Sequence, residues 1–180
     1  MFDILNYVKI FTDNVNRINI ALFSTNNNDT PVLLVNDNAN YKNIYDFPTV
    51  KNMHVGDCIV MFPGDLVITW KSEKRLLTRL LSDILECLKS YDMDVYMNGN
   101  DVMMNGCKLF GTMSTELSGI RYEGMFISFN SDINIIQDVC KKQMNKRPLG
   151  ISDKRIRADL IKIIEQFCKD KNLEICGGEQ

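Results

Sequence analysis

Apolar residues recur at two different periods along this chain. Near the N-terminus, Ile18, Ile20 and Leu22 occupy every second position, which is the period of a half-buried β-strand. Further apolar runs of strand length lie at Pro31–Val35, Val55–Phe62, Leu66–Trp70, Val95–Met97 and Met125–Phe129. We therefore predict a strand at each of these positions.

A longer apolar stripe follows the predicted strand at Leu66–Trp70. Leucine and isoleucine recur at three- and four-residue spacing from Leu76 to Leu88, which predicts a core-facing helix over Glu73–Tyr91. Ser72 directly precedes this segment, and serine is a residue type that accepts hydrogen bonds from the free N–H groups at a helix start. We therefore expect Ser72 to cap the helix.

The C-terminal part of the chain repeats the helical period. Apolar residues at this spacing after Asp153 predict a last helix, capped by Asp153 and ending at about Lys171. The segment from Ile133 to about Met144 is expected to be a helix or a turn-rich stretch. The glycine-containing tail, from about residue 173, is expected to fray.

The order of the predicted elements indicates a fold class. Strands cluster in the centre of the chain, and helices interrupt them without strict alternation. This order favours an α+β fold, with a mainly antiparallel sheet and helices packed on one face. At 180 residues, the chain is expected to form a single domain over 1–180 with a sizeable core.

Composition and charge narrow the function classes. Hydrophobic residues make up 45% and charged residues 24% of the chain, which is ordinary for a soluble globular protein. The net charge of −2 gives no electrostatic reason to expect nucleic acid or an anionic membrane as a partner. No apolar run reaches the length of a membrane span, and the N-terminus has no signal-peptide pattern, so we expect a cytoplasmic protein.

The metal-binding and nucleophilic residue types are also limited. The chain has six cysteines, none in a CxxC pattern, and reduced, mostly buried thiols are expected. His54 is the only histidine, which excludes zinc sites built on several histidines.

The segment from Asn100 to Gly111 reads as a β-hairpin that places a lysine beside an acid. Asn105-Gly106 is a strong hairpin-turn signal, and Lys108 follows it on the return strand. Asp101 enters the same hairpin. A cation near a carboxylate and an amide suits the binding of a phosphate or an activated carboxylate. The alternative is a surface hairpin with a solvated lysine.

The surroundings of this hairpin favour a function over a solvated surface. A predicted helix, Asn-Asp, a strand, Asn-Gly-x-Lys-x-x-Gly and then an apolar strand ending in Asn-x-Asp follow one another. From about Val32 to the C-terminal helix, this order resembles the catalytic domain of the lipoate–protein ligase and biotin–protein ligase superfamily. The resemblance implies the same α+β architecture.

The resemblance also implies roles for individual residues. Lys108 matches the family's essential catalytic lysine, which contacts the acyl carbonyl and the phosphate. Asn100 and Asp101 match a nucleotide- and Mg²⁺-facing pair, so Asp101 is the expected metal ligand. Gly111 and Gly124 match glycines that let the backbone approach the acyl-adenylate closely.

One family motif is altered in this chain. The family's paired arginines and glycine triplet correspond to the stretch from Lys51 to Asp65, in which Gly56 alone remains of the triplet. Gly56 and Asp57 are the expected substrate-binding residues of this stretch. The paired arginines are Lys51 and Asn52 here. Loss of bidentate arginine contacts should weaken triphosphate binding, because lysine is a point charge and asparagine is neutral.

Two further positions bear on the mechanism. Octanoyl-transferring relatives carry a nucleophilic cysteine where this chain has Leu149, which argues against a cysteine-based transferase at that position. Cys107, next to Lys108, remains either a thiol nucleophile or a buried strand cysteine. The family's histidine before Gly124 is Glu123 in this chain.

The resemblance therefore implies a lipoate–protein ligase-like acyltransferase. With ATP and Mg²⁺ it would activate lipoate or octanoate as acyl-AMP and transfer the acyl group to a lysine of a lipoyl carrier domain. The alternative is a catalytically degenerate relative that binds a small molecule or a protein without turnover, so whether the chain is an enzyme stays open. A third alternative is that only the fold is shared.

Overall fold

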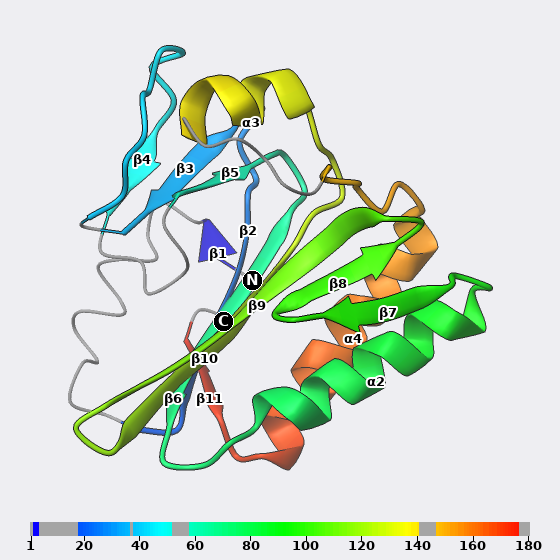
Figure 1. Cartoon of the computed structure of the whole chain (residues 1–180). Coiled ribbons are helices and arrows are strands. Elements are labelled where there is room, and N and C mark those ends of the chain that lie inside the picture. Colours follow the sequence, from blue (N-terminus) through cyan, green and yellow to red (C-terminus); the bar gives the residue numbers. More distant parts are fainter. Residues whose placement is uncertain (1, 4–17, 37, 52–57, 141–146, 177–180) are drawn as a thin grey trace.

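The computed structural model describes residues 2–3, 18–36, 38–51, 58–140 and 147–176. The largest unit that these residues form is a strongly twisted sheet (Figure 1). Eight strands form it: β1 (Phe2–Asp3), β2 (Ile20–Thr25), β6 (Leu66–Ser72), β7 (Val95–Asn98), β8 (Asp101–Met104), β9 (Cys107–Leu117), β10 (Ile120–Ile127) and β11 (Glu174–Cys176).

The path of the large sheet is mainly antiparallel. Its strand order is β1-β2-β6-β10-β9-β8-β7, and each pair from β2 to β7 is antiparallel. Both β1 and β11 join β2 in parallel. The predicted α+β class, with a mainly antiparallel sheet, is thus confirmed.

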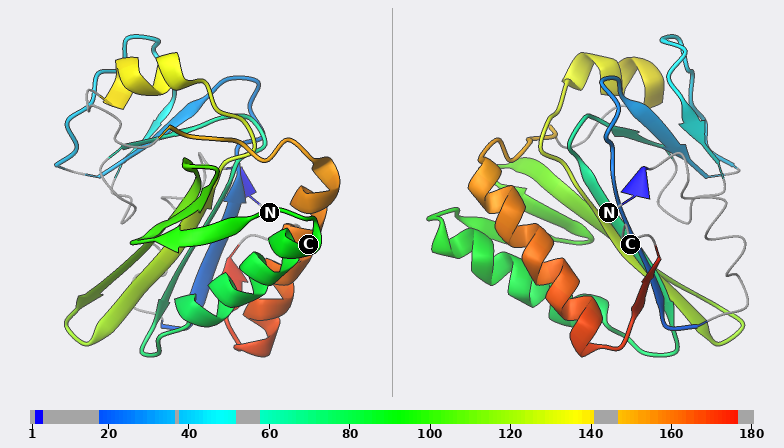
Figure 2. Two further views of the ribbon diagram at one scale, coloured as in Figure 1. Left: turned by 45° about the vertical axis from the view of Figure 1, so that its right-hand side comes forward. Right: turned by 180° about the vertical axis from the view of Figure 1, so that it is seen from behind.

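Two helices cover one face of this sheet. Helices α2 (Leu77–Ser90) and α4 (Lys154–Asp170) lie side by side there (Figure 2). Leu80, Ile84 and Leu88 of α2 are fully buried, as the apolar stripe predicted. They pack in one core with alternate residues of the sheet strands, including Trp70.

The opposite face of the large sheet carries a small second sheet. In it, β3 (Val32–Val35) lies between β4 (Thr49–Val50) and β5 (Cys58–Met61). Leu34 and Met61 pack with residues of the large sheet. On its other side, the small sheet is covered by α3 (Ile133–Cys140), whose Val139 is fully buried.

The predicted caps of the two long helices had different outcomes. Asp153 caps α4 as expected, because its side chain accepts a hydrogen bond from the Arg155 N–H at 2.8 Å. The prediction for Ser72 was wrong. Ser72 is the last residue of β6, and its hydroxyl accepts from the Lys74 N–H, while α2 begins only at Leu77.

The expectation of a frayed tail from about residue 173 was wrong for residues 173–176, while residues 177–180 lie outside the described residues. Leu173 is buried, and Glu174–Cys176 form β11, which pairs with β2. The open edge of β2 offers backbone hydrogen-bonding groups that this segment satisfies. Among the described helices, none is long and apolar enough to cross a membrane.

Candidate functional site

The predicted hairpin is present and contains an irregularity that decides where Lys108 lies. Asn105 and Gly106 have φ angles of 50° and 75°, as a tight hairpin turn requires. Asp101 pairs with Gly111, yet Met103 pairs with Lys108, so the register shifts at a β-bulge. Strict alternation would place residues 108 and 111 on opposite faces. The bulge instead brings Lys108 to the face that carries Asp101 and Gly111.

Lys108 and Asp101 form an ion pair on this face. The Nζ of Lys108 lies 2.6 Å from Oδ1 of Asp101, with side-chain exposures of 38% and 20%. A Cβ atom at Gly111 would lie only 3.0 Å from that Nζ. Gly111 therefore leaves the space that the lysine ammonium occupies. This contact is a second reason for a glycine here, besides the expected close approach of the backbone to an acyl-adenylate.

The segment after residue 146 is held along the backbone of Lys108. The Lys108 N–H donates to the Arg147 carbonyl at 2.8 Å, and the Leu149 N–H donates to the Lys108 carbonyl at 2.7 Å. A Cβ at Gly150 would lie 2.6 Å from the Phe129 carbonyl oxygen. The Arg-Pro-Leu-Gly segment that carries part of the resemblance therefore lies directly beside the lysine.

The other predicted site residues have varied surroundings. Asn100 is exposed, and its carbonyl accepts hydrogen bonds from the N–H and hydroxyl of Thr112. Gly124 shares the sheet face of its strand neighbour Phe126, which pairs with Gly111. A Cβ at Gly124 would lie 2.6 Å from the Ile68 carbonyl oxygen, so close strand packing requires this glycine. The predicted residues at 56 and 57 lie outside the described residues.

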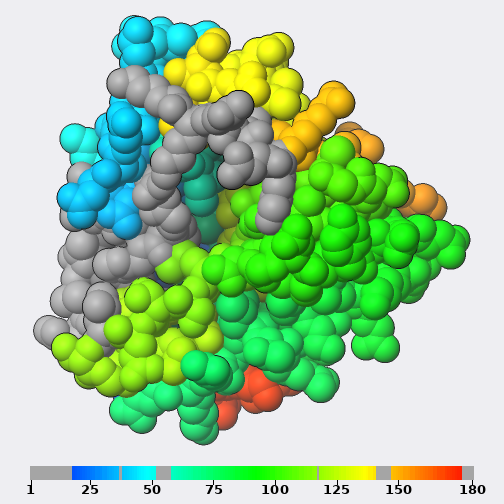
Figure 3. All heavy atoms as spheres, viewed as in Figure 1, coloured from blue at the N-terminus to red at the C-terminus, as the bar shows by residue number. Residues whose placement is uncertain are grey.

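The face that Lys108 shares looks towards the small sheet. Phe126 and Met113 on this face pack against the apolar cluster between the two sheets. The molecular surface is hollowed between β3 and the β8–β9 hairpin (Figure 3). Cys107 pairs with Met104, which places it on the opposite face from Lys108. This position disfavours Cys107 as a nucleophile acting beside the lysine.

Glu123 has a structural task that the sequence did not reveal. It is 2% exposed on the helix-covered face of β10. Its Oε2 accepts hydrogen bonds from the Leu76 N–H at 2.8 Å, the Leu77 N–H at 2.9 Å and Trp70 Nε1 at 3.0 Å. Glu123 thus satisfies the first N–H groups of α2 with a charge that suits a helix N-terminus. In the sequence, the only sign of this structural role was an acidic residue within an apolar strand.

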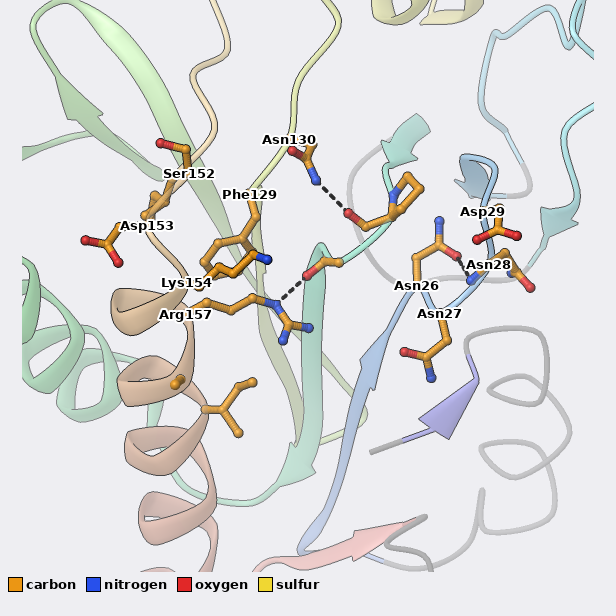
Figure 4. Close-up of a pocket in the computed structure, with 15 residues that line it drawn as sticks. Asn26, Asn27, Asn28, Asp29, Phe129, Asn130, Ser152, Asp153, Lys154 and Arg157 are labelled. Atoms are coloured by element: carbon orange, nitrogen blue, oxygen red, sulfur yellow. Dashed lines mark hydrogen bonds between the residues drawn. The ribbon is translucent and has the colours of Figure 1, made fainter.

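A separate cavity of about 600 Å³ lies at the start of α4 (Figure 4). Its lining includes the Asn26–Asp29 turn, Gly64, Phe129 and Arg157, and it does not include Lys108. Arg157 lies over the Phe129 ring at 5.5 Å, and its Nε donates to the Gly64 carbonyl at 2.9 Å. Its Nη2 donates to Thr25 Oγ1 at 3.0 Å.

The buried side chain of Asp65 holds two residues of the cavity wall, Phe129 and Asn130, in place. Asp65 is fully buried and accepts hydrogen bonds from the N–H groups of Phe62 at 2.8 Å, Phe129 at 2.6 Å and Asn130 at 3.1 Å. Burial raises the pKa of Asp65 to about 7, against the opposing effect of these N–H groups. Asp65 thereby joins the β5–β6 turn to the end of β10.

The described residues offer a limited basis for a metal site. Asp101 supplies a carboxylate, but that carboxylate is paired with Lys108. In the described part of the chain, no group of three or more His, Cys, Asp or Glu side chains is placed to hold a metal ion. A magnesium ion at Asp101 would therefore depend on oxygens of a bound phosphate.

Comparison with known proteins yields matches in structure but not in sequence. No family model and no curated protein sequence matches this chain. P. falciparum LipL1, solved in complex with lipoate, has a TM-score of 0.69 at 16% identity, over 92% of this chain and 59% of its own. This chain thus spans less than two thirds of that protein.

Two further solved structures give similar values. The bi-partite lipoate protein ligase of Thermoplasma acidophilum, solved with its E2 lipoyl domain, has a TM-score of 0.65 at 14% identity, over 92% of this chain and 78% of its own. Lipoate-protein ligase A bound with ATP has a TM-score of 0.66 at 11% identity, over 97% of this chain and 82% of its own. The strand order and these structural matches together show that the chain has the α+β fold of the lipoate–protein ligases.

Proposed function

We propose that this protein is a lipoate–protein ligase-like acyltransferase. It transfers a lipoyl or octanoyl group from acyl-AMP to a lysine of a lipoyl carrier domain. The observation that carries the proposal is the placement of Lys108, which a bulge, an ion pair with Asp101 and the missing side chain of Gly111 together hold on one sheet face. The fold shared with lipoate–protein ligases supports it.

The proposed role of Lys108 in catalysis is electrostatic. In the transfer step, the carrier amine attacks the acyl carbonyl, a C–N bond forms, and the bond between the carbonyl carbon and the phosphate oxygen breaks. AMP leaves with the electron pair, and the amine proton passes to solvent. An ammonium group placed at the carbonyl and phosphate oxygens stabilises the negative charge that develops there. Asp101 keeps the lysine side chain in one position, which reduces the entropy lost when the acyl-adenylate binds.

Activation with ATP and Mg²⁺ is the less supported half of the reaction. When bound, they supply the adenylyl group and charge neutralisation that convert the acid to acyl-AMP. Lys51, at the position of one family arginine, is an exposed side chain and offers a single point charge to a triphosphate. Asp101 supplies the carboxylate that fits a magnesium ion bound to the phosphates. We therefore propose that acyl-AMP, supplied preformed, is used more readily than free acid and ATP.

The test compares the two halves of the reaction. The purified chain is mixed with an isolated lipoyl carrier domain and either octanoyl-AMP or octanoate with ATP–Mg²⁺, and the carrier mass is followed over time. We expect carrier acylation from octanoyl-AMP above the uncatalysed rate. Lys108→Ala should lower it by ~100-fold, as expected for loss of one preorganised charge. Lys89→Ala changes an exposed lysine in the last turn of α2 and serves as the control.

Other outcomes separate the alternatives. Acylation from octanoyl-AMP that is equal in the wild type and Lys108→Ala would contradict the proposed role of the lysine. If octanoyl-AMP raises the melting temperature but no carrier is acylated, the chain is a binding module without turnover. If neither binding nor transfer occurs, only the fold is shared with the ligases.

A further inference from the structure

Two cysteines that are distant in sequence meet between the small sheet and α3. Cys58 begins β5, and Cys140 is the last residue of α3. The Sγ of Cys140 lies 3.7 Å from the Cys58 carbonyl oxygen, across 82 positions of sequence. Both side chains pack against the same apolar cluster. Both residues are half-buried, so a small reagent has access to them.

Described neighbours hold the backbone at each of the two cysteines. Cys58 pairs with Val35 in the small sheet. Cys140 follows Val139, which is fully buried and whose carbonyl accepts a hydrogen bond from the Lys42 N–H at 2.8 Å. The residues around the thiols form an apolar cluster that packs α3 onto β5. Because the Cys140 sulfur already lies against the backbone of Cys58, the two cysteines need mainly side-chain rotation to reach disulfide geometry, and the fold favours this pairing over others.

We propose that Cys58 and Cys140 form a redox-active dithiol site, which reacts with low-molecular-weight disulfides to give an internal disulfide. The thiolate of Cys140 attacks one sulfur of the reagent, forms a mixed disulfide and releases one reagent thiolate. The sulfur of Cys58 then attacks Cys140 Sγ and releases the second. One S–S bond forms in the protein as one is broken in the reagent, and the two protein protons pass to the released thiolates.

The electrostatics of the pair agree with this order of attack. The hydrogen bond from Cys58 lowers the pKa of the Cys140 thiol, whereas the same contact and burial raise the pKa of Cys58. A lowered thiol pKa increases the fraction of reactive thiolate at neutral pH. The lowered pKa makes Cys140 the expected attacking thiol, and the disulfide that forms is the same for either order of attack.

The position of the pair suggests what the disulfide controls. Cys58 directly follows Gly56 and Asp57 in sequence, the residues that the family resemblance assigns to substrate binding. Cys140 ends the helix that leads towards the segment beside Lys108, where Arg147 accepts from the Lys108 N–H. A disulfide would join the start of β5 to the end of α3. This consequence for acyl transfer rests on the proposed function, whereas formation of the disulfide does not.

The test is a redox titration of the full chain. The protein is equilibrated in buffers of increasing oxidised-to-reduced glutathione ratio, quenched in acid, alkylated and digested without reductant, and the linked peptides are identified by mass spectrometry. We expect a Cys58–Cys140 disulfide at a lower oxidised fraction than any other disulfide. Cys58→Ser and Cys140→Ser should each abolish it and leave the remaining thiol as a mixed disulfide with glutathione. Cys87→Ser, which changes a half-buried cysteine of α2, should leave it unchanged.

The outcomes decide the proposal even if a serine variant fails to fold, because the wild-type peptide map is sufficient. Separate glutathione adducts on Cys58 and Cys140, or alkylation of both at high oxidised glutathione, would overturn it. Melting of the oxidised and reduced wild type gives a second readout, in which the disulfide raises the melting temperature. If the disulfide forms but oxidised and reduced protein acylate the carrier equally, the redox site stands and its coupling to transfer fails.

Discussion

Lys108 and Gly111 lie three positions apart in one strand and still share one face of the sheet. The bulge between them, marked by the pairing of Met103 with Lys108 and of Val102 with Phe110, cancels the alternation of the strand. The Lys108 ammonium consequently occupies the space in which a side chain at position 111 would stand. The lysine, the glycine and the bulge therefore work as a unit.

Gly111→Ala tests this relationship. The new methyl group would lie 3.0 Å from Lys108 Nζ, and the ammonium, as the end of a flexible side chain, can move away. We expect the free energy of unfolding to change by less than ~1 kcal/mol, while acyl transfer falls ~10- to 100-fold because the charge is displaced. Urea unfolding and the carrier acylation assay measure the two effects, with Ser114→Ala on the exposed part of β9 as control. Unchanged transfer would show that the ammonium position is not critical.

Asp101→Asn tests whether the acid positions the lysine. The pair is partly exposed, so its removal should cost less than ~1 kcal/mol of stability. Transfer from acyl-AMP should nevertheless fall, with a larger effect on kcat than on KM, because the lysine loses its fixed position and not its charge. Asp83→Asn removes the acid of an exposed helical ion pair and is the matched control. Equal kinetics for Asp101→Asn and wild type would show that Asp101 has no part in acyl transfer.

Glu123→Ala should be strongly destabilising. It leaves the Leu76 and Leu77 N–H groups and the Trp70 indole N–H without their common acceptor in a buried place. We expect a loss of ~3–5 kcal/mol in the free energy of unfolding, because each of these neutral donors costs about 1–3 kcal/mol when it is left unsatisfied in a buried place. Glu123→Gln keeps an acceptor oxygen and should cost only about half as much. Urea denaturation measures both, and Glu165→Ala, on the exposed side of α4, is the control. Losses below ~1 kcal/mol in both variants would contradict a capping role.

The buried Asp65 predicts a pH dependence of stability. Its folded-state pKa of about 7 lies above its ordinary value of 3.8, so the folded protein holds a proton that the unfolded chain releases. The stabilising contribution is therefore complete below about pH 4 and is lost as the pH rises through about 7. Unfolding free energies of wild type minus Asp65→Asn should decrease from pH 5 through pH 7 and level off above about pH 8. A flat difference over this range would mean that the three N–H donors keep the carboxylate ionised.

Local sequence patterns predicted the elements that depend on residues close in sequence or that bury only one face. The leucine stripe of α2 and the Asp153 cap of α4 were found because residues within a few positions decide them. The hairpin turn at Asn105 and Gly106 was found because few residue types tolerate positive φ angles. These elements comprise the two longest helices and the β8–β9 hairpin of the described chain.

Long-range partners explain the errors. The start of α2 was misplaced because its acceptor, Glu123, lies 47 positions beyond Leu76. The tail was expected to fray because a three-residue segment has no stable structure until β2 offers its edge. The separate small sheet also escaped prediction, since the burial of both faces of β3 removes the alternation that distinguishes a strand's inner face.

The sequence by itself determined the fold class, the hairpin and the candidate lysine, because periodicity, turn chemistry and motif order are local properties of the chain. Only the tertiary structure decided which face Lys108 occupies, that Gly111 makes room for it, and that Cys58 lies against Cys140. A bulge changes side-chain direction without changing residue order, and a contact across 82 positions depends on how separate layers pack. Such relationships arise from packing and register, which one-dimensional patterns do not contain.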